Sequence, residues 1–334
     1  MPSSRGLCRL VLFASVIWVQ SSPAQTGATS AQRLLPTPGV SLDIPAVPTI
    51  TKDVNEVQLA FTAVDHHGKF VTDLADTDLN LLDDQNPPAK VAFFHRQQEL
   101  PVRVAVVVDV SASVAHVFRT EQRSAVDFLA KVIRPDKDQA TVIAFNSQPT
   151  VVQDFTSDAN ALSAAVHELK STPGATAIYD AVRFACNRLQ KGTSNELWRK
   201  AIVLITDGEE NSSRAHMADA VAAAQQANVV VFAIYVNTTP SWNSPSGAQV
   251  LRQISEPTGG RKLLAGWRGQ LASAFAKIEE ELRSQYVIGY IPAAWKSDGH
   301  FRHIQLKSAR RGIHLHYRPG YYELAGSRPS LDQP

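Results

Sequence analysis

The feature that most restricts the fold of this chain is a regular alternation of strand-like and helix-like segments between residues 102 and 283. Residues 104–108 form an uninterrupted apolar run rich in valine, which is typical of a strand buried on both faces of a sheet. Similar runs at 140–145, 201–205 and 229–235 are separated by segments with helical periodicity. This alternation predicts an α/β fold with a doubly wound, mostly parallel sheet.

The same reasoning assigns the other elements of this central block. Short strands are expected at 151–155, as an edge strand, and at 262–264. Helices are expected at 117–132, 159–169, 178–189, 216–227, 250–254 and 271–282. We therefore expect one α/β domain over residues 101–283.

Two β-rich segments flank this domain. Before it, strands are expected at 57–63, 79–81 and 90–94, and after it at 285–290, 303–307 and 313–317. Each flank is too short for a sandwich of its own, so its strands need partners from elsewhere. We predict that an N-terminal β segment (49–100) and a C-terminal β segment (284–324) pair into one small β-sandwich. A tail of residues 325–334 follows.

The N-terminus has the pattern of a secretory signal peptide. Arg5 and Arg9 lead into an apolar run at 10–19, and small residues before Ala24 suit cleavage after that position. The run is shorter than the roughly 20 residues of a transmembrane helix, although an uncleaved anchor is the alternative. We expect a signal peptide at 1–24, a flexible linker at 25–48, and export to the periplasm, the cell surface or the medium, with no further membrane span.

Cysteine content and charge restrict the chemistry of the mature protein. Cys8 lies in the signal peptide, which leaves Cys186 without a partner, so no intrachain disulfide is expected. Cys186 lies on an apolar helical stripe and is expected to be a core residue. The formal net charge of +2 gives no electrostatic basis for binding nucleic acid or an anionic membrane.

Polar oxygen donors follow two of the predicted strands and precede one predicted helix. Asp109, Ser111 and Ser113 come directly after the first buried strand, and Asp207 follows the strand at 201–205. Thr176 lies in the loop before the helix at 178–189. Ligands of open α/β sheets collect outside the carboxyl ends of the strands, so these side chains are expected to converge there.

Two carboxylates and three hydroxyls are hard oxygen donors, which suit Mg²⁺, Mn²⁺ or Ca²⁺. Few charged ligands on a rigid sheet edge favour Mg²⁺, a small octahedral ion that retains water and can accept an external carboxylate oxygen. Each element alone has a simpler explanation, since Asp109, Ser111 or Thr176 could cap a helix and Asp207 could lie in a turn. The three together, in this order at strand ends, favour a metal site. The acidic loop 209–212 is expected to be solvated at its rim.

These residues resemble the metal-ion-dependent adhesion site of the von Willebrand factor A family. The family pattern is an Asp followed by Ser two and four residues later, a Thr on a middle loop and an Asp at a later strand end. Asp109, Ser111, Ser113, Thr176 and Asp207 fill all five positions. The resemblance covers roughly 102–283 and implies that both serines coordinate the ion directly, with the other three binding directly or through water.

The flanks resemble those of von Willebrand factor A-related proteins found in acidobacteria. The matching segments are Gly68 with Val71 and Leu74, the Gln-Tyr segment at 285–290, and the closing segment at 318–322. These segments are less specific than the metal pattern.

The leading functional hypothesis is a binding module without enzymatic activity, whose ion contacts an acidic side chain of a protein partner. No nucleophilic elbow, zinc-protease helix or phosphate-binding loop occurs in the sequence. The alternatives are a metal-dependent hydrolase or phosphoryl-transfer enzyme that uses the same ion, and a scaffold whose site is only structural. A histidine site formed by His303, His314 and His316 is a weaker candidate.

Overall fold

The structure is a computed structural model, and it describes residues 56–96, 100–114, 118–191, 198–236, 246–265, 270–295 and 298–322. The predicted signal peptide, linker and C-terminal tail lie outside the described residues. The chain divides into two compact units, Met1–Thr51 and Lys52–Pro334, and all described residues belong to the second. Within the described ranges, no helix has the length and apolar character needed to cross a membrane.

A six-stranded sheet forms the centre of the α/β part. Its strands are β4 (Val102–Asp109), β5 (Gln139–Phe145), β6 (Pro149–Thr156), β7 (Arg199–Thr206), β8 (Val229–Tyr235) and β9 (Lys262–Leu264). They lie in the order β6-β5-β4-β7-β8-β9, and all pairs are parallel except β5 with β6. This arrangement confirms the predicted mostly parallel sheet and the edge position of residues 151–155.

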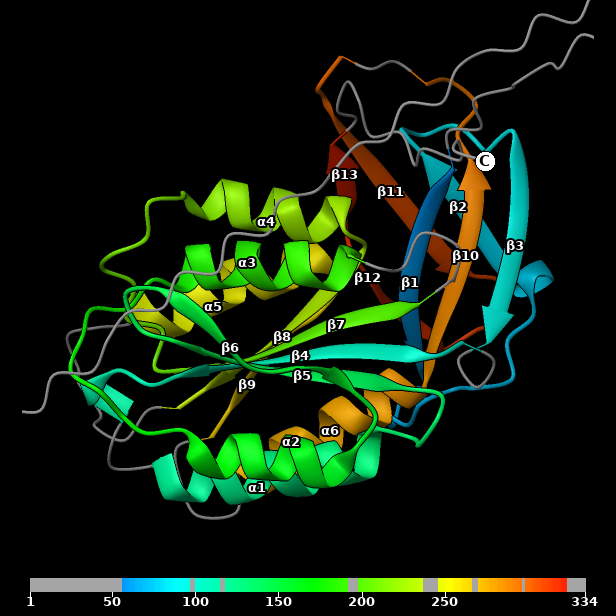
Figure 1. Cartoon of the computed structure of the whole chain (residues 1–334). Helices are drawn as coiled ribbons and strands as arrows, with labels where there is room; N and C mark the ends of the chain where they lie inside the picture. Colours follow the sequence, from blue (N-terminus) through cyan, green and yellow to red (C-terminus); the bar gives the residue numbers. More distant parts are fainter. Residues whose placement is uncertain are drawn as a thin grey trace, which may run out of the picture. The chain divides into compact units, whose positions relative to one another are not determined.

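Helices cover both faces of this sheet (Figure 1). The helices α1 (Phe118–Val132), α2 (Ala159–Glu168) and α6 (Gln270–Arg283) lie on one face. The helices α3 (Ile178–Gln190), α4 (Met217–Gln226) and α5 (Ser246–Ser255) lie on the other. Every residue of β4 is buried, because its alternate side chains enter two cores: Val104 and Val106 lie in the core shared with α1, α2 and α6, and Val107 lies in the core shared with α3, α4 and α5.

Cys186 lies in the core beneath α3, as the sequence predicts. Burial raises the pKa of its thiol to about 12, so the reactive thiolate is not formed at neutral pH.

The flanking segments pair with each other, as predicted, in two antiparallel sheets. One contains β1 (Val57–Val64), β3 (Lys90–Arg96), β10 (Gln285–Ile291) and β12 (His314–Tyr317) in the order β12-β1-β10-β3. The other contains β2 (Leu79–Asp83), β11 (Phe301–Ser308) and β13 (Gly320–Tyr322) in the order β13-β11-β2. Side chains from both sheets share one core, including Phe61, Tyr286 and Leu306.

Tyrosine hydroxyls connect the two flanks inside this core. The Tyr286 hydroxyl accepts a hydrogen bond from the Leu74 amide (3.1 Å) and donates one to the Val71 carbonyl (3.0 Å). The hydroxyls of Tyr290 and Tyr321 donate to the same oxygen of Asp83, at 2.6 and 2.9 Å. Each bond joins residues separated by more than 200 positions, so neither flank completes the core alone.

Arg318 joins the sandwich to the α/β part. This side chain is buried, and its guanidinium donates one hydrogen bond to the Gln225 carbonyl at the end of α4 and another to the Gln58 carbonyl in β1, both at 2.9 Å.

Candidate metal centre

The ends of β4 and β7 bring the first two groups of predicted ligands to one edge of the sheet. These strands are parallel neighbours, with Val108 opposite Ile205, so Asp109 and Thr206 end the strands at the same level. The Thr206 hydroxyl donates a hydrogen bond of 2.6 Å to Oδ2 of Asp109, and both residues are buried. The carboxylate of Asp109 is therefore held at the carboxyl edge of the sheet.

Asp109 and the two serines form a connected set. Oδ1 of Asp109 accepts a hydrogen bond from the Ser111 amide (2.9 Å), which turns the chain sharply after β4. Oγ of Ser111 and Oγ of Ser113 lie 3.0 Å apart. Ser111 is buried, whereas Ser113 is exposed in the short 3₁₀ helix Ala112–Val114. The set thus reaches from the buried carboxylate to the surface.

The environment of Asp109 disfavours its negative charge. Burial raises the pKa of this carboxyl most, the hydrogen bonds from Thr206 and Ser111 lower it, and the nearby charge of Asp207 raises it again. The net result is a pKa above the ordinary value. The two carboxylates are therefore close enough to repel each other at this edge.

Asp207 lies in a tightly held turn at the end of β7. It is half-buried, and its Oδ1 accepts a hydrogen bond from the Glu209 amide (3.1 Å). The Gly208 amide donates to the Thr206 hydroxyl (3.1 Å), and Gly208 has φ +75°. Oxygen Oδ1 of Asp207 thus stabilises the turn, which is the alternative role that the sequence suggests for this residue. Asp207 also lies at the edge of the sheet.

Main-chain hydrogen bonds join Thr176 to the loop that follows Asp207. The Thr176 amide donates to Oδ1 of Asn211 (2.7 Å), and its carbonyl accepts from the amides of Asn211 (3.0 Å) and Ser212 (3.1 Å). The loop that contains Thr176 is also bonded to the residue after β4, because the Thr172 amide donates to the Val110 carbonyl (2.8 Å). All three predicted ligand loops are therefore connected by hydrogen bonds.

The cap of α3 comes from Glu210 and not from Thr176. Oε2 of Glu210 accepts hydrogen bonds from the amide of Ile178 (2.6 Å) and from the hydroxyl of Ser213 (2.8 Å). The N-cap residue of α3 is Ala177, which makes no side-chain capping bond. The prediction of a solvated acidic loop is thus wrong for Glu210, because a carboxylate at a helix N-terminus satisfies amides that have no partner within the helix. Glu209 is exposed, as predicted.

Two further side chains of this region were missed by the sequence reasoning. Thr206 fixes Asp109, and Asn211 fixes Thr176. Thr206 directly precedes the predicted ligand Asp207 at the end of a buried strand, and this position could have indicated its role. Asn211 acts across 35 positions in the sequence and had none.

The histidine alternative finds no support in the described ranges. No group of three or more His, Cys, Asp or Glu side chains is arranged there to hold a metal ion. His303 lies on β11 in one sheet of the sandwich, whereas His314 and His316 lie on β12 in the other. The candidate centre at β4 and β7 has only two carboxylates and otherwise offers hydroxyls.

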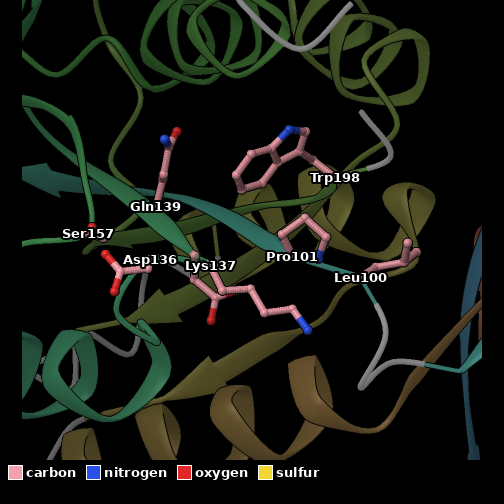
Figure 2. A pocket seen from close by; sticks show the side chains of 8 residues that line it. Leu100, Pro101, Asp136, Lys137, Gln139, Ser157 and Trp198 are labelled. Carbon is pink, nitrogen blue, oxygen red and sulfur yellow. The ribbon is translucent and has the colours of Figure 1, made fainter. Parts of the chain in front are cut away.

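Two hollows lie at opposite edges of the central sheet. The larger, of about 680 Å³, lies at the amino ends of the strands, where Trp198 and Pro101 face Gln139 and Lys137 (Figure 2). It includes none of the five predicted ligands. The smaller, of about 340 Å³, lies at the carboxyl ends, beside Val110 and Thr172. The larger hollow and the oxygen cluster therefore lie at opposite edges of the sheet.

No curated protein sequence matches the chain. The conserved hypothetical protein BatB from Bacteroides thetaiotaomicron is 19% identical, with 54% of this chain and 97% of that chain covered and a TM-score of 0.45. Proximal thread matrix protein 1 from the mussel byssus, with zinc in its MIDAS motif, is 20% identical (56% and 47% covered, TM-score 0.46).

The vWF domain of the type V pili tip protein Mfa5 from Porphyromonas gingivalis is 13% identical, with 54% and 94% covered and a TM-score of 0.42. The family comparison is more specific, because it places a defined model on a defined stretch of the chain. Residues 104–265, which include all five predicted ligands, match the model of the von Willebrand factor type A domain, and the helix-covered parallel sheet has a fold like that of this domain.

Proposed function

We propose that the α/β part binds one divalent cation, Mg²⁺, through Asp109, Ser111, Ser113, Thr176 and Asp207, and that the ion binds an acidic side chain of a protein partner. The observation that carries this proposal is the pair of serine hydroxyls, 3.0 Å apart, beside a buried carboxylate at the carboxyl edge of the sheet. The match of residues 104–265 to the von Willebrand factor type A domain supports the same function.

The hydroxyl spacing fits the coordination of magnesium. Two ligands at neighbouring corners of an octahedron with bonds of about 2.0–2.1 Å lie roughly 2.9 Å apart. The separation of Oγ of Ser111 and Oγ of Ser113 is 3.0 Å. Because the donor set consists of oxygens alone, it suits Mg²⁺ or Mn²⁺ better than Zn²⁺ or Cu⁺.

The two carboxylates give the ion an electrostatic role at this edge. A buried carboxylate is costly unless it is paired with positive charge or fully hydrogen-bonded. Asp109 has two hydrogen-bond donors and the neighbouring negative charge of Asp207. A bound divalent cation would supply the missing positive charge and, with few charged ligands, would keep attraction for an external carboxylate.

The surrounding residues of this chain would hold the ligands in position. Thr206 and the Ser111 amide fix the Asp109 carboxylate, and Asn211 fixes the Thr176 main chain. Ser113 is exposed, which leaves the outer side of the cluster open to a partner. Together with the expected signal peptide at 1–24, this favours an exported protein that binds other proteins in the periplasm or at the cell surface.

Calorimetry with Mg²⁺ tests the metal site. We expect Mg²⁺ uptake by the wild type and its loss in Asp109→Ala and Asp207→Ala. Glu209→Gln is the matched control, because Glu209 is an exposed carboxylate on the same loop, and it should bind as the wild type does. Wild-type protein that takes up neither Mg²⁺ nor Mn²⁺ would contradict the proposal.

Partner binding needs a separate experiment. Recovery of an extracellular partner on the immobilised protein should require Mg²⁺, and it should fail with EDTA or with Asp109→Ala. Equal recovery in all of these conditions would refute the role in binding. Turnover of a phosphate ester or a peptide that disappears in Asp109→Ala would instead support the hydrolase alternative.

A further inference from the structure

The smaller hollow shares a wall with the candidate metal centre. It lies between the end of β4, the β5–β6 connection and the segment that joins α2 to α3. Val110, which lines it, stands between the proposed ligands Asp109 and Ser111. The Val110 carbonyl accepts the hydrogen bond from the Thr172 amide, and Thr172 lines the hollow as well. A molecule that reaches the ion is therefore beside the hollow.

The floor of the hollow is formed by apolar side chains at the end of a hydrophobic core. Val110 and Leu169 belong to the core on the α1 and α2 face of the sheet, and Ala144 and Val152 pack against that core. Val110 and Leu169 are themselves buried, whereas Ala144 and Val152 are half-buried and leave apolar surface in the hollow, which has a volume of about 340 Å³. Such a floor favours contact with an apolar group over contact with water.

The rim of the hollow is polar and carries balanced charge. Asn146, Gln148 and Thr150 contribute neutral polar groups. Glu168 and Lys170, both exposed, contribute one charge of each sign. An apolar floor with a polar rim is the arrangement by which protein interfaces accept an anchoring side chain. The balanced charge gives no reason for the occupant to be ionic.

We propose that this hollow binds an apolar side chain of about leucine or methionine size, which lies next to the metal-binding acidic residue in the partner. This inference rests on the proposed function. The carboxylate supplies attachment to the ion, and the adjacent apolar residue supplies selectivity among acidic segments. A partner segment with an apolar neighbour should bind about tenfold or more tightly than one without it, because a leucine side chain is then removed from water.

Three seven-residue peptides test this proposal on the full chain. One has a central aspartate between glycines, and the others replace the glycine before or after the aspartate with leucine. Dissociation constants are measured by NMR titration in saturating Mg²⁺ and in EDTA. We expect at least one leucine peptide to bind about tenfold more tightly than the glycine peptide, and only in Mg²⁺.

Thr150→Trp fills the hollow from the exposed side of β6, and Thr150→Ser is the matched control. The tryptophan variant should lose the preference for leucine but keep the affinity for the glycine peptide and the uptake of Mg²⁺. The serine variant should keep all three. Equal binding of the three peptides in Mg²⁺, or a leucine preference that survives Thr150→Trp or EDTA, overturns the inference alone. Failure of every peptide to bind in Mg²⁺ overturns the proposed function as well.

Discussion

The Thr206 hydroxyl holds both the carboxylate of Asp109 and the main chain that follows Asp207. It donates to Oδ2 of Asp109 at 2.6 Å and accepts from the Gly208 amide at 3.1 Å, and it is fully buried. Removing the donor of a buried carboxylate oxygen costs more folding free energy than removing the donor of an exposed one, because no water replaces the hydrogen bond. At the scale of single residues, Thr206 therefore controls the geometry of the candidate centre.

Thr206→Val keeps the shape of the side chain and removes the hydroxyl. We expect a loss of about 1–3 kcal/mol in the free energy of unfolding, measured by urea denaturation. Mg²⁺ affinity in calorimetry should fall by about tenfold, because residues that orient metal ligands have effects of this size. Thr206→Ser should restore the affinity. A valine variant with unchanged Mg²⁺ affinity would show that Asp109 needs no support from Thr206.

Asp138 fills a structural role at the opposite edge of the sheet. It is buried, and it accepts hydrogen bonds from the Val102 amide (2.8 Å) and from Nε (2.6 Å) and Nη2 (2.8 Å) of Arg134. Burial alone raises the pKa of this carboxyl, but the bonds from Arg134 and Val102 outweigh it and bring the pKa below its ordinary value. Folding therefore favours the ionised form of Asp138.

The stability that Asp138 contributes should depend on pH in a defined direction. Because its pKa is lower in the folded protein, the contribution is complete above the unfolded value of about 3.9 and disappears as the pH falls through the folded value. We expect Asp138→Asn to lower the free energy of unfolding by about 2 kcal/mol at pH 7. Urea denaturation between pH 3 and 7 should show the difference from the wild type closing at the acid end. A difference that does not change with pH would contradict this account.

At the scale of secondary-structure elements, the turn after β7 packs directly on the start of α5. A Cβ atom built on Gly208 would lie 2.4 Å from the Gly247 carbonyl oxygen, and one built on Gly247 would lie 2.4 Å from the Asp207 carbonyl oxygen. Two glycines are therefore needed for the main chains to approach this closely. This contact fixes the position of Asp207 relative to α5.

Gly208→Ala combines two costs, a positive φ and a steric clash with main chain. Gly68→Ala is the matched control, because Gly68 has φ +79° but no atom within 4 Å of the added Cβ. We expect about 1 kcal/mol of destabilisation for Gly68→Ala and about 2–3 kcal/mol for Gly208→Ala in urea denaturation. Mg²⁺ affinity should fall only in Gly208→Ala. Equal losses of stability in the two variants would mean that the turn moves away from α5 at no cost.

Periodicity in the sequence predicted most elements to within one or two residues, because buried strands and amphipathic helices leave a repeating pattern. The strand expected at 229–235 coincides with β8, and the helix expected at 159–169 nearly coincides with α2. The three-residue strand β13 was missed, since alternation cannot be recognised over so short a stretch. The sequence pattern also did not predict which strands pair, such as β2 with β11, because local sequence carries no information on the register between distant strands.

The sequence likewise predicts one part of the candidate centre and not the other. Strand ends and oxygen donors were visible in the sequence, so the positions of Asp109, Ser111 and Asp207 at one sheet edge could be expected. The cap of α3 by Glu210 could not, because it depends on how the loop after β7 folds back over 32 positions. The hydrogen bond between Asn211 and Thr176 is hidden from sequence for the same reason.

At the scale of the whole second unit, the strands that precede the α/β part and the strands that follow it belong to the same sandwich. Strand β10 begins directly after α6 and pairs with both β1 and β3, which precede the block. Residues 57 and 290 are thus neighbours, although the entire α/β part lies between them. Contacts so distant in sequence slow folding, because the closure of a long loop costs entropy before the contact forms.

Arg318 is the residue at which the junction between the sandwich and the α/β part can be tested. Arg318→Met keeps the aliphatic bulk but removes the guanidinium hydrogen bonds to the carbonyls of Gln225 and Gln58. We expect a loss of about 3 kcal/mol in urea denaturation and faster amide exchange at the end of α4 and in β1, because buried groups lose hydrogen bonds to a charged partner. Arg310→Met is the control: Arg310 forms an exposed ion pair with Asp73, and such pairs contribute about 0–1 kcal/mol. If both variants lost the same small amount, the sandwich and the α/β part would be joined mainly by apolar packing, and the buried guanidinium would not hold them together.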